Sequence, residues 1–432
     1  MRNLRGYRVL YVAQSLLRVL PRYWALLLYE RFAGKPASQA AWDRAHRAAA
    51  AQLRRTALAL RGGFVKVAQI AGARADVLPK PFIDELSQFH DDVPPRPFEA
   101  LRPSIESELG APLEEIFASI EPTPLGAASL AQVHRARLRD GSDVVIKIQY
   151  PEARRIFPLD LLLARRVAGL VQRMQSVIDF ESLATEITRF VEMELDFRRE
   201  AQSMARLGRI LSTLDLVRVP RIFEEYTRDR VLVMELLDGI QVTRVRELRA
   251  AGHKLSDVAR KVGALYGGML FEYGFFHGDP HPGNLLVLAD GRIGLLDFGL
   301  CKELPAGFAR SVAQMMVSAL IGDRAETLEA ARQLGFEIDA VGPDALRSLM
   351  LSVLGDSSED GNLLSVLGST RIRRIPEDFA LVLRTMILLN GLSHRLAPGR
   401  RLLQAALLEH LAAGARAGAS GEAGEAAMLA AS

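Results

Sequence analysis

The stretch from His277 to Gly299 constrains this chain more than any other, because it combines acidic and amide side chains with two short apolar runs. Leu285–Val287 and Ile293–Leu296 have the length and composition of strands, and Asp290-Gly291 between them is typical of a hairpin turn. The second run ends at Asp297-Phe298-Gly299. We therefore expect a hairpin with polar side chains at both of its ends.

Asp279 and Asn284 stand five residues apart, which is the separation in the catalytic-loop pattern H-R-D-x-x-x-x-N. Phosphoryl transfer mainly requires a protein to hold Mg²⁺ and to align two oxygens. We therefore predict that Asn284 and Asp297 bind Mg²⁺, and that Asp279 accepts a proton from the attacking group or orients it. The alternative is an acidic turn with capping aspartates, but that interpretation does not explain Asn284.

Composition limits the other possibilities. The chain has 432 residues, enough for two or three domains, and 49% of them are hydrophobic, so a large core can form. The single cysteine, Cys301, rules out a disulfide framework and a multi-thiolate metal site. A formal net charge of +4 favours modest attraction to anionic lipid or nucleotides over dedicated nucleic-acid binding.

Residues 1–35 are apolar and basic, but Arg18, Pro21 and Arg22 interrupt the run. No stretch therefore reaches the ~20 apolar residues that span a bilayer. No small-residue cleavage site follows, so we expect neither a signal peptide nor a transmembrane span. Two interpretations stay open: an interfacial amphipathic segment, or a helix packed on the body of the protein.

Residues 36–121 have a helical pattern. Helices are predicted over Ala41–Leu60, Pro103–Leu109 and Leu113–Ile120. Lys66 and Gln69 lie three apart and so share a helix face, although a solvated lysine and glutamine would produce the same pattern.

Beyond Pro122, the runs Arg135–Leu138 and Val144–Gln149 flank the turn Asp140-Gly141 and predict two paired strands. Lys147 lies inside the second strand, where a buried ammonium group is costly unless it is paired. We predict that Lys147 binds the α- and β-phosphates of a nucleotide. The alternative is an edge-strand lysine that points to water.

An acidic partner for Lys147 is expected on the helical stretch Phe180–Leu211, where periodicity alone does not choose among Glu192, Glu194, Asp196 and Glu200. Strands are predicted at Val219–Glu224 and Val231–Glu235. In a two-lobed kinase the second of these leads into the hinge. We therefore expect Met234, Glu235 and Leu237 beside the adenine base.

After Gly299 the pattern is again helical, with helices predicted at Pro305–Ile321, Arg324–Leu334, Asp344–Leu354 and Glu377–His394. Residues 412–432 are rich in alanine, glycine and glutamate, which predicts a flexible tail.

Taken together, these residues resemble the UbiB/AarF/ADCK family of atypical kinases from about Leu60 to Arg400. Several stretches are similar to the motifs of that family: Lys66–Gln69 to the K-x-G-Q signature, Leu125–His134 to the alanine-rich phosphate loop, Lys147 to the strand lysine, Glu194–Asp196 to the E-x-D motif, Glu200 to the helix glutamate, His277–Asn284 to the catalytic loop, Asp297–Gly299 to the metal motif and Ile375–Pro398 to the C-terminal signature.

The resemblance implies an α+β, protein-kinase-like, two-lobed fold with a mostly helical N-terminal extension and a helical C-lobe. The expected division is an apolar and basic segment (1–35), the extension (36–121), the N-lobe (122–237), the C-lobe (238–411) and the tail (412–432). The resemblance also implies an active site in which Lys66 and Gln69 pair with Glu194 and Asp196. In this site Glu200 orients Lys147, and backbone N–H groups cover the phosphates. The expected phosphate-loop residues are Gly126, Ala127, Ala128 and Ser129.

The family resemblance also implies ATP and Mg²⁺ as ligands, and ATPase activity that supports ubiquinone or other prenyl-lipid biosynthesis. The expected location is the cytoplasm or the inner face of a membrane. The expected partners are anionic lipid, prenyl-lipid precursors and enzymes of that pathway, and the oligomeric state is open.

This chain departs from the family pattern at three positions. Ala68 replaces the glycine of K-x-G-Q, which predicts crowding at a close approach. Gly126 stands where alanine is more usual, which predicts a looser phosphate loop. Gly278 replaces the arginine of ordinary kinases, and no A-P-E follows Gly299.

Two alternatives belong to other functional classes. A small-molecule kinase similar to the aminoglycoside and choline kinases also carries H-G-D-x-x-x-x-N, although the Lys66–Gln69 segment and the alanine-rich loop argue against it. A nucleotide-gated scaffold would bind ATP without turning it over.

Overall fold

A computed structural model of the chain describes residues 5–72, 78–86, 95–173, 180–338, 372–374, 376–398 and 401–420. The helix predicted at Asp344–Leu354 lies outside these residues. The chain divides into two compact units. The first comprises Met1–Phe197 and Glu224–Val233, and the second comprises Arg198–Phe223 and Met234–Ser432. Glu200, expected in the N-lobe, therefore belongs to the second unit.

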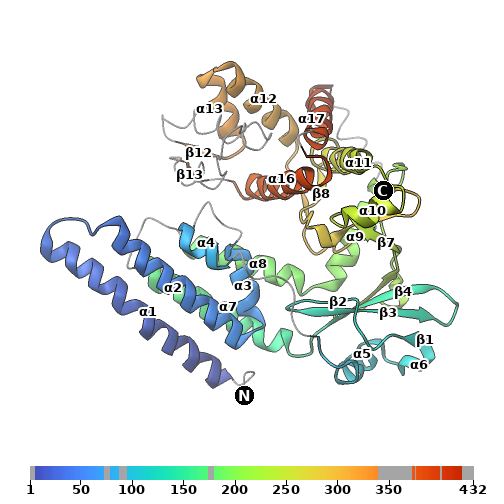
Figure 1. Cartoon of the computed structure of the whole chain (residues 1–432), viewed down its shortest axis with the longest axis horizontal. Coiled ribbons are helices and arrows are strands. Elements are labelled where there is room, and N and C mark those ends of the chain that lie inside the picture. Colours follow the sequence, from blue (N-terminus) through green and yellow to red (C-terminus); the bar gives the residue numbers. More distant parts are fainter. Residues whose placement is uncertain are drawn as a thin grey trace. The chain divides into compact units, whose positions relative to one another are not determined.

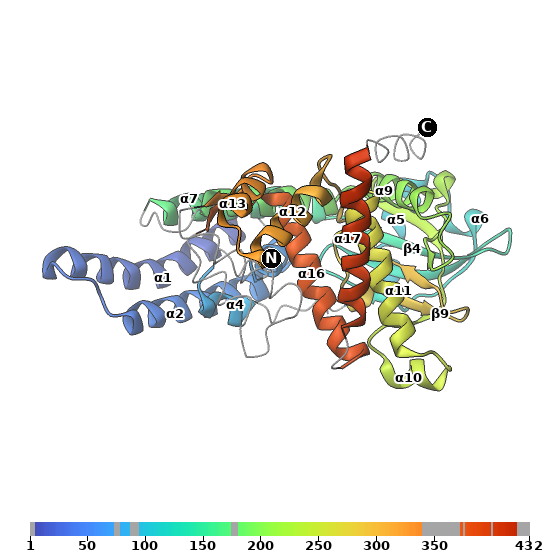
Figure 2. The same cartoon turned by 90° about the horizontal axis from the view of Figure 1, so that it is seen from above.

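Helices make up most of the first unit (Figures 1 and 2). They are α1 (Arg5–Ala33), α2 (Gln39–Leu60), α3 (Gly63–Gly72), α4 (Lys80–Leu86), α5 (Arg102–Leu109), α6 (Leu113–Ile116), α7 (Ala153–Gln172) and α8 (Phe180–Glu194). The long helices α1 and α2 pack side by side, and α3 packs on α2, α7 and α8. Among the helices that the structure describes, none combines the length and the apolar character that crossing a bilayer requires.

A five-stranded sheet completes the first unit. Its strands are β1 (Phe117–Ile120), β2 (Gly126–Ala127), β3 (Ala131–Leu138), β4 (Asp143–Gln149) and β6 (Val231–Glu235, which continues into the second unit). The order is β1-β3-β4-β6, and β2 pairs with β3. The predicted hairpin is confirmed, because β3 and β4 are antiparallel and Val133 lies opposite Lys147.

A buried ion pair joins four helices of the first unit. The guanidinium of Arg8 donates to both carboxylate oxygens of Asp160, at 2.6 and 2.5 Å. It also donates to the carbonyl oxygens of Leu60 and Arg61 at the end of α2, at 2.9 and 3.3 Å. The Asp160 carboxylate in turn accepts the N–H groups of Gly63 and Phe64, the first residues of α3.

The turn between α2 and α3 requires its glycines. Arg61 and Gly62 both have positive φ, at 55° and 56°. A Cβ atom on Gly63 would lie 2.7 Å from Oδ2 of Asp160, so a side chain there would displace the carboxylate. Burial raises the pKa of Asp160 to about 6, and the hydrogen bonds and charge of Arg8 oppose that rise. Arg8 therefore keeps a buried carboxylate ionised at neutral pH.

The described part of the second unit consists of helices and short strands. Its helices are α9 (Phe197–Ile210), α10 (Val245–Ala250), α11 (Leu255–Gly267), the π-turn η3 (Gly268–Glu272), the 3₁₀ turn η4 (Pro282–Asn284), α12 (Phe308–Ile321), α13 (Arg324–Gln333), α16 (Glu377–Leu396) and α17 (Leu402–Ser420). Its strands are β5 (Val217–Arg218), β7 (Gly239–Gln241), β8 (Phe275–His277), β9 (Leu285–Leu288), β10 (Ile293–Leu295), β11 (Cys301–Glu303), β12 (Glu337–Ile338) and β13 (Ile372–Arg374).

The predicted hairpin of the second unit is confirmed. β9 and β10 are antiparallel, with Val287 opposite Ile293. The turn has the chemistry that its sequence predicts: Gly291 has φ 79°, and the Asp290 carboxylate accepts the N–H of Arg292 at 3.0 Å. The sheet order is β5-β10-β9-β7, and β8 pairs separately with β11. Figure 2 shows α17 beside α11 and α16, the helices on which it packs.

Three predicted elements are wrong in detail. The helix predicted over Leu113–Ile120 ends at Ile116, because the next four residues pair with β3 as β1. The strand predicted over Val219–Glu224 forms only a single bridge, from Ile222 to Met234, and the observed strand β5 covers Val217–Arg218 instead. The pairing is interrupted at Pro220, because proline has no N–H to donate. The helix predicted over Phe180–Leu211 breaks at Leu195, whose carbonyl oxygen accepts the side-chain amide of the buried Gln149 at 3.0 Å.

The predicted tail is helical in its first part, because α17 continues to Ser420. Its Gly414 packs so closely that a Cβ atom there would collide with the carbonyl oxygen of Phe271. Residues 421–432 lie outside the described part of the chain.

We predict that Arg8→Met destabilises the first unit by about 3–5 kcal/mol, because the buried Asp160 loses the guanidinium and must either hold its charge in the interior or take up a proton. The double variant Arg8→Met/Asp160→Leu should regain most of that loss. Urea unfolding followed by tryptophan fluorescence measures this directly, since Trp24 and Trp42 both belong to the first unit.

The matched control is Arg137→Met, which breaks the exposed pair between Arg137 and Asp143. It should cost less than about 1 kcal/mol. An Arg8→Met cost no larger than that of the control would contradict a structural role for the buried pair.

Candidate active site

The catalytic-loop residues of the second unit are held by the backbone of the β9–β10 hairpin. The side-chain amide of Asn284 donates to the carbonyl oxygen and to Oδ2 of Asp279, both at 3.2 Å. The N–H of Leu296 donates to the carbonyl oxygen of Asn284 at 2.9 Å, which joins the loop to the strand that leads to Asp297. The structure therefore brings Asp279 and Asn284 into contact, as the spacing predicts.

Asp297 has a strained backbone. Its φ is 56°, a conformation that side chains other than glycine, asparagine and aspartate rarely adopt. Its carboxylate accepts the N–H of Gly299 at 3.1 Å, and its carbonyl oxygen lies 2.7 Å from Nε2 of His277. A strained residue held by several contacts is typical of functional sites.

The buried His277 ring contacts both the Asp297–Gly299 motif and Tyr266. Its Nε2 faces the carbonyl oxygens of Leu296 and Asp297, at 3.1 and 2.7 Å, and so carries the hydrogen. Its Nδ1 then accepts the hydroxyl hydrogen of Tyr266 at 2.9 Å. Burial, followed by the charge of Asp279, raises the pKa of Tyr266 well above its usual value, so this hydroxyl stays protonated.

Phe298 of the same motif is buried against the His277 ring, with centroids 5.7 Å apart in an edge-on arrangement. Its N–H donates to Oε1 of Glu200 at 3.3 Å. Glu200 is 2% exposed. The position of Glu200 therefore depends on the Asp297–Gly299 motif. The sequence analysis did not predict this contact.

Cys301 lies across the β8–β11 ladder from His277. Burial, followed by the charges of Glu200 and Asp297, raises the pKa of its thiol above the usual range. The thiol is therefore neutral and buried, which excludes it as a nucleophile at ordinary pH.

Arg384 is a site residue that the sequence analysis missed. Its guanidinium lies on α16 and donates to Oδ1 of Asp279 at 3.0 Å. The next residue, Thr385, donates its hydroxyl to the carbonyl oxygen of Gly278 at 3.2 Å. No local pattern could reveal this contact, because more than a hundred residues separate the two partners.

Gly278 has a steric reason to be glycine. Its N–H donates to the carbonyl oxygen of Leu300 at 2.6 Å, and a Cβ atom would lie 2.8 Å from that same oxygen. The arginine of ordinary kinases at this position is therefore incompatible with the local backbone.

In the first unit, the predicted contact between the helical extension and the E-x-D motif is present. Nζ of Lys66, on α3, lies 2.6 Å from Oε1 of Glu194 at the end of α8. Gln69 lies one turn further along α3, and Asp196 follows α8 after a one-residue break. Ala68 is fully buried, so the packing of α3 accommodates the methyl group that was expected to crowd this position.

Lys147 occupies the middle of β4. Its Nζ lies 5.3 Å from the ring centroid of the buried Phe197, a favourable position for a cation over an aromatic face. The predicted phosphate loop is the turn of a short hairpin: Gly126 and Ala127 pair with β3, and Ala128 donates its N–H to Ala131 at 2.8 Å. Ser129 is buried, whereas Gly126 has open space where a Cβ atom would lie.

The predicted adenine-contacting segment begins in β6. Met234 is buried, and the N–H of Glu235 donates to the carbonyl oxygen of Arg221 at 2.8 Å. This N–H is therefore already bonded within the protein. The Glu235 carboxylate is paired with Arg218 at 2.7 Å.

The donor set fits Mg²⁺. Asp297 has a carboxylate that can bind the ion. The amide nitrogen of Asn284 faces Asp279, so the amide oxygen of Asn284 is available as the second donor. Mg²⁺ is usually held by one or two protein oxygens together with phosphate oxygens and water. Among the described residues there is no cluster of three or more histidine, cysteine or acidic side chains that could hold a metal ion by itself.

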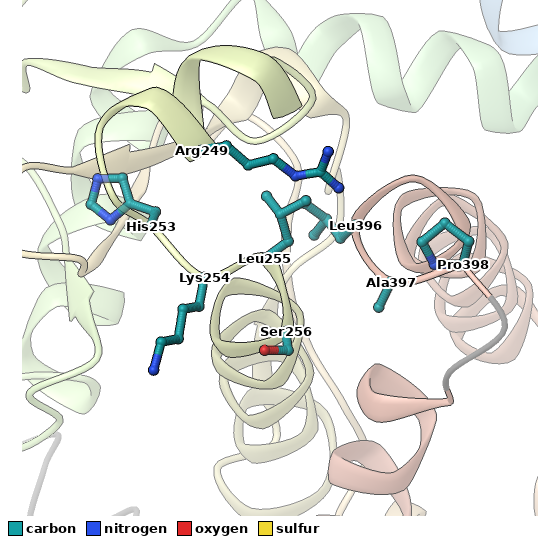
Figure 3. Close-up of a pocket in the computed structure, with 8 residues that line it drawn as sticks. All are labelled: Arg249, His253, Lys254, Leu255, Ser256, Leu396, Ala397 and Pro398. Atoms are coloured by element: carbon teal, nitrogen blue, oxygen red, sulfur yellow. The ribbon is translucent and has the colours of Figure 1, made fainter.

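The C-terminal signature segment lines a separate pocket of the second unit, shown in Figure 3. Leu396, Ala397 and Pro398 lie opposite the start of α11, and the pocket has a volume of about 340 Å³. None of the predicted site residues lines it. The first part of this signature, Ile375, lies outside the described residues.

Comparison with known proteins identifies the family. A family model described as the ABC1 atypical kinase-like domain matches residues 88–331, more than half of the chain. The chain belongs to this ABC1/AarF family of atypical kinases. The resemblance predicted from the motifs is therefore confirmed. Lys147, Asp279, Asn284 and Asp297 lie within the matched range, whereas Lys66 and Gln69 precede it.

Several curated proteins are similar to this chain. An uncharacterised chloroplastic aarF domain-containing protein kinase of Arabidopsis thaliana is 33% identical over 84% of the chain and 53% of its own length. The chloroplastic protein ACTIVITY OF BC1 COMPLEX KINASE 1 of the same plant is also 33% identical, over 89% and 58%. AarF domain-containing protein kinase 1 of Gallus gallus is 34% identical over 67% and 57%. The chain thus spans little more than half the length of these relatives.

The fold has a solved counterpart. The complex of Rv3197 with erythromycin from Mycobacterium tuberculosis matches with a TM-score of 0.56 and 24% identity, over 81% of this chain and 96% of that one. At this identity the match concerns the fold. Together with the family match, it confirms the α+β, protein-kinase-like class.

We predict that Gly278→Arg, which restores the residue of ordinary kinases, destabilises the second unit, because its Cβ atom would collide with the Leu300 carbonyl. Thermal unfolding should show a clear loss of stability. Gly391→Ala on α16 is the matched control, since a Cβ atom there meets nothing within 4 Å. A Gly278→Arg protein as stable as the control would disprove the steric explanation.

Proposed function

We propose that the chain is an ATP-dependent phosphotransferase or ATPase that uses Mg-ATP and supports the biosynthesis of ubiquinone or another prenyl lipid at a membrane surface. One observation carries the nucleotide part of the proposal. The hairpin of the second unit presents Asp279 and Asn284, in contact with each other, and the strained Asp297 at the same open end, where the N–H of Leu296 donates to the carbonyl oxygen of Asn284. The kinase names of the curated relatives support the same class of chemistry.

Each residue has a stated role in this proposal. Asn284 and Asp297 would hold Mg²⁺, which when bound neutralises charge on the phosphates. Asp279 would orient the attacking hydroxyl or water through the carboxylate oxygens that Asn284 and Arg384 hold in place. Arg384 is therefore proposed as a positioning residue for Asp279.

Of the residues proposed to act at the phosphates, Lys147 and Gly126–Ser129 belong to the first unit and Glu200 belongs to the second. Lys147 would bind the α- and β-phosphates, Glu200 would orient Lys147, and the backbone at Gly126–Ser129 would cover the phosphates. The Lys66–Glu194 pair, with Nζ and Oε1 2.6 Å apart, would hold α3 against the end of α8. In this way Lys66 and Gln69 would act on the site through the E-x-D motif.

We predict that Asp297→Asn lowers Mg²⁺-dependent ADP release by roughly a hundredfold or more, because the site loses its charged metal ligand. Asparagine tolerates positive φ about as well as aspartate, so the fold should persist. Asp290→Asn, in the exposed turn of the same hairpin, is the control and should keep wild-type turnover. Equal turnover in Asp297→Asn and Asp290→Asn would reject the metal role.

The same assay separates the alternative functions. ADP release without any acceptor indicates an ATPase, and many-fold stimulation by a soluble hydroxyl compound indicates a small-molecule kinase. A nucleotide-dependent rise in melting temperature without turnover indicates a scaffold, because a ligand that binds only the native state stabilises it.

The membrane part of the proposal rests on the outward face of α1. Leu10, Leu17, Trp24, Leu28 and Phe32 are 51–83% exposed and recur at spacings of seven and four residues, which places them on one side of the helix. The exposed Arg18, Arg22 and Arg31 accompany them. An apolar and aromatic face with basic residues beside it is the composition of helices that lie in a bilayer interface.

We predict that the triple variant Leu17→Ser/Trp24→Ser/Phe32→Ser binds vesicles at least tenfold more weakly than wild type, since each large apolar side chain contributes ~1.5–3 kcal/mol when buried. Cosedimentation with phosphatidylcholine vesicles that contain one third phosphatidylglycerol measures the affinity. Val317→Ser/Ile321→Ser removes equally exposed apolar groups from α12 and should bind like wild type. Undiminished binding of the triple variant would contradict a role for α1.

A further inference from the structure

The helix α9 is attached at two points to the chain around the metal motif. Near the start of the helix, Glu200 accepts the N–H of Phe298 at 3.3 Å. Further along it, the guanidinium of Arg206 donates to both carboxylate oxygens of Glu303, at 3.0 and 2.6 Å. These four residues all belong to the second unit. One helix therefore contacts the chain both inside the Asp297–Gly299 motif and just after it.

The Arg206 guanidinium is held by two neighbouring strands. Its central carbon lies 4.3 Å from the ring centroid of the buried Phe275, a favourable distance for a cation beside an aromatic ring. Phe275 on β8 lies opposite Glu303 on β11 in the antiparallel ladder. An isolated surface ion pair contributes little, but a bidentate pair that also contacts an aromatic ring has a fixed geometry. Arg206 therefore sets the position of α9 relative to β11.

This contact is not part of the hydrophobic core. The side chains of Arg206 and Glu303 are 38% and 64% exposed. Removal of either charge leaves the other one in water, so it creates neither a cavity nor a buried unpaired charge, which are the usual causes of large destabilisation. The packing of α9 comes instead from buried side chains such as Met204 and Leu207. Arg206 can therefore be changed without loss of the fold.

β11 is held on its other face as well, because successive side chains of a strand point to opposite faces. Nζ of Lys302, next to Glu303, lies 2.5 Å from Oδ1 of Asp378 on α16. The same helix carries Arg384, which contacts Asp279 of the catalytic loop. β11 therefore connects α9 to the helix that holds Asp279.

The acidic partner of Arg206 carries its charge without modification. In ordinary protein kinases, phosphorylation of the activation loop controls the helix that carries the lysine-pairing glutamate, and the phosphate acts through new pairs with arginine. In this chain no serine, threonine or tyrosine occurs between Gly299 and Ser311. The hydrogen bonds from Arg206 lower the pKa of the Glu303 carboxyl, although burial opposes them. Glu303 is therefore ionised at neutral pH.

The position of α9 bears on the metal motif through Phe298. Asp297 has a φ of 56°, and a strained conformation of this kind persists only where the surrounding structure over-determines it. The bond from the Phe298 N–H to Glu200 is one of the contacts that hold this backbone. A helix released from β11 would draw Glu200 away from Phe298, and the Asp297 carboxylate would lose its fixed position.

We propose that Arg206 is a positioning residue for the Asp297–Gly299 motif. Together with Glu303 it holds α9 where Glu200 accepts the Phe298 N–H, and it does so permanently, without phosphorylation. The inference rests on the proposed function, in which Asp297 is a ligand of Mg²⁺.

The first test measures how ADP release depends on Mg²⁺. Arg206→Gln and Glu303→Gln should each raise the Mg²⁺ concentration for half-maximal release about threefold to tenfold at an unchanged melting temperature, since the equilibrium position of α9 shifts. The double variant Arg206→Glu/Glu303→Arg restores the pair and should recover most of this loss. Arg209→Gln, which removes an exposed arginine from the same helix, is the control and should behave like wild type. Unchanged Mg²⁺ dependence in both single variants, or a double variant no better than either, overturns the proposal.

The second test needs no turnover. Hydrogen–deuterium exchange, read by mass spectrometry on the peptide that contains Phe298, should be several-fold faster in Arg206→Gln than in wild type or Arg209→Gln, because the acceptor of the Phe298 N–H is displaced. A wild-type protein that releases no ADP would reject the proposed function, and the exchange rate would still decide the role of Arg206. An unchanged exchange rate in folded Arg206→Gln overturns that role, even where turnover has fallen.

Discussion

The buried pair between Arg8 and Asp160 determines how the first unit is assembled. Asp160 on α7 accepts both the Arg8 guanidinium of α1 and the first N–H groups of α3, while Arg8 closes the end of α2. Four helices therefore meet at one charged contact. α3 carries Lys66, so the position of Lys66 relative to Glu194 depends on a pair of residues that touches neither of them. Residues of the same four helices also line a pocket of about 680 Å³.

The hairpin of the second unit shows what local sequence can predict. Asp290-Gly291 has the positive φ and the side-chain acceptor that its turn requires, and the flanking strands are apolar throughout. Asn284 and Asp297 lie next to the paired strands, so the pairing determines where these two residues are placed. Spacing and turn chemistry were sufficient here, and the contact between Asp279 and Asn284 followed.

Other features depend on partners that are distant in the chain. The pattern of Leu113–Ile120 is compatible with a helix, and only the edge of β3 converts its second half into a strand. The amide of Gln149 meets Leu195 where a continuous helix was expected. Arg384 reaches Asp279, and Arg8 reaches Asp160, across more than a hundred residues in each case. Periodicity describes which face of an element is apolar, but it does not identify which element that face will meet.

The close approach of Gly414 to Phe271 has a practical meaning for handling this protein. Phe271 belongs to the π-turn that precedes β8, and β8 ends at His277, the residue that supports the metal motif. The alanine- and glycine-rich end of the chain is an obvious segment to remove when the protein is shortened. A chain that ends before Gly414, however, would lack the surface on which the π-turn packs. Poor ATP turnover by a shortened protein would then reflect a displaced His277–Asn284 loop, and would not count against the proposed substrate.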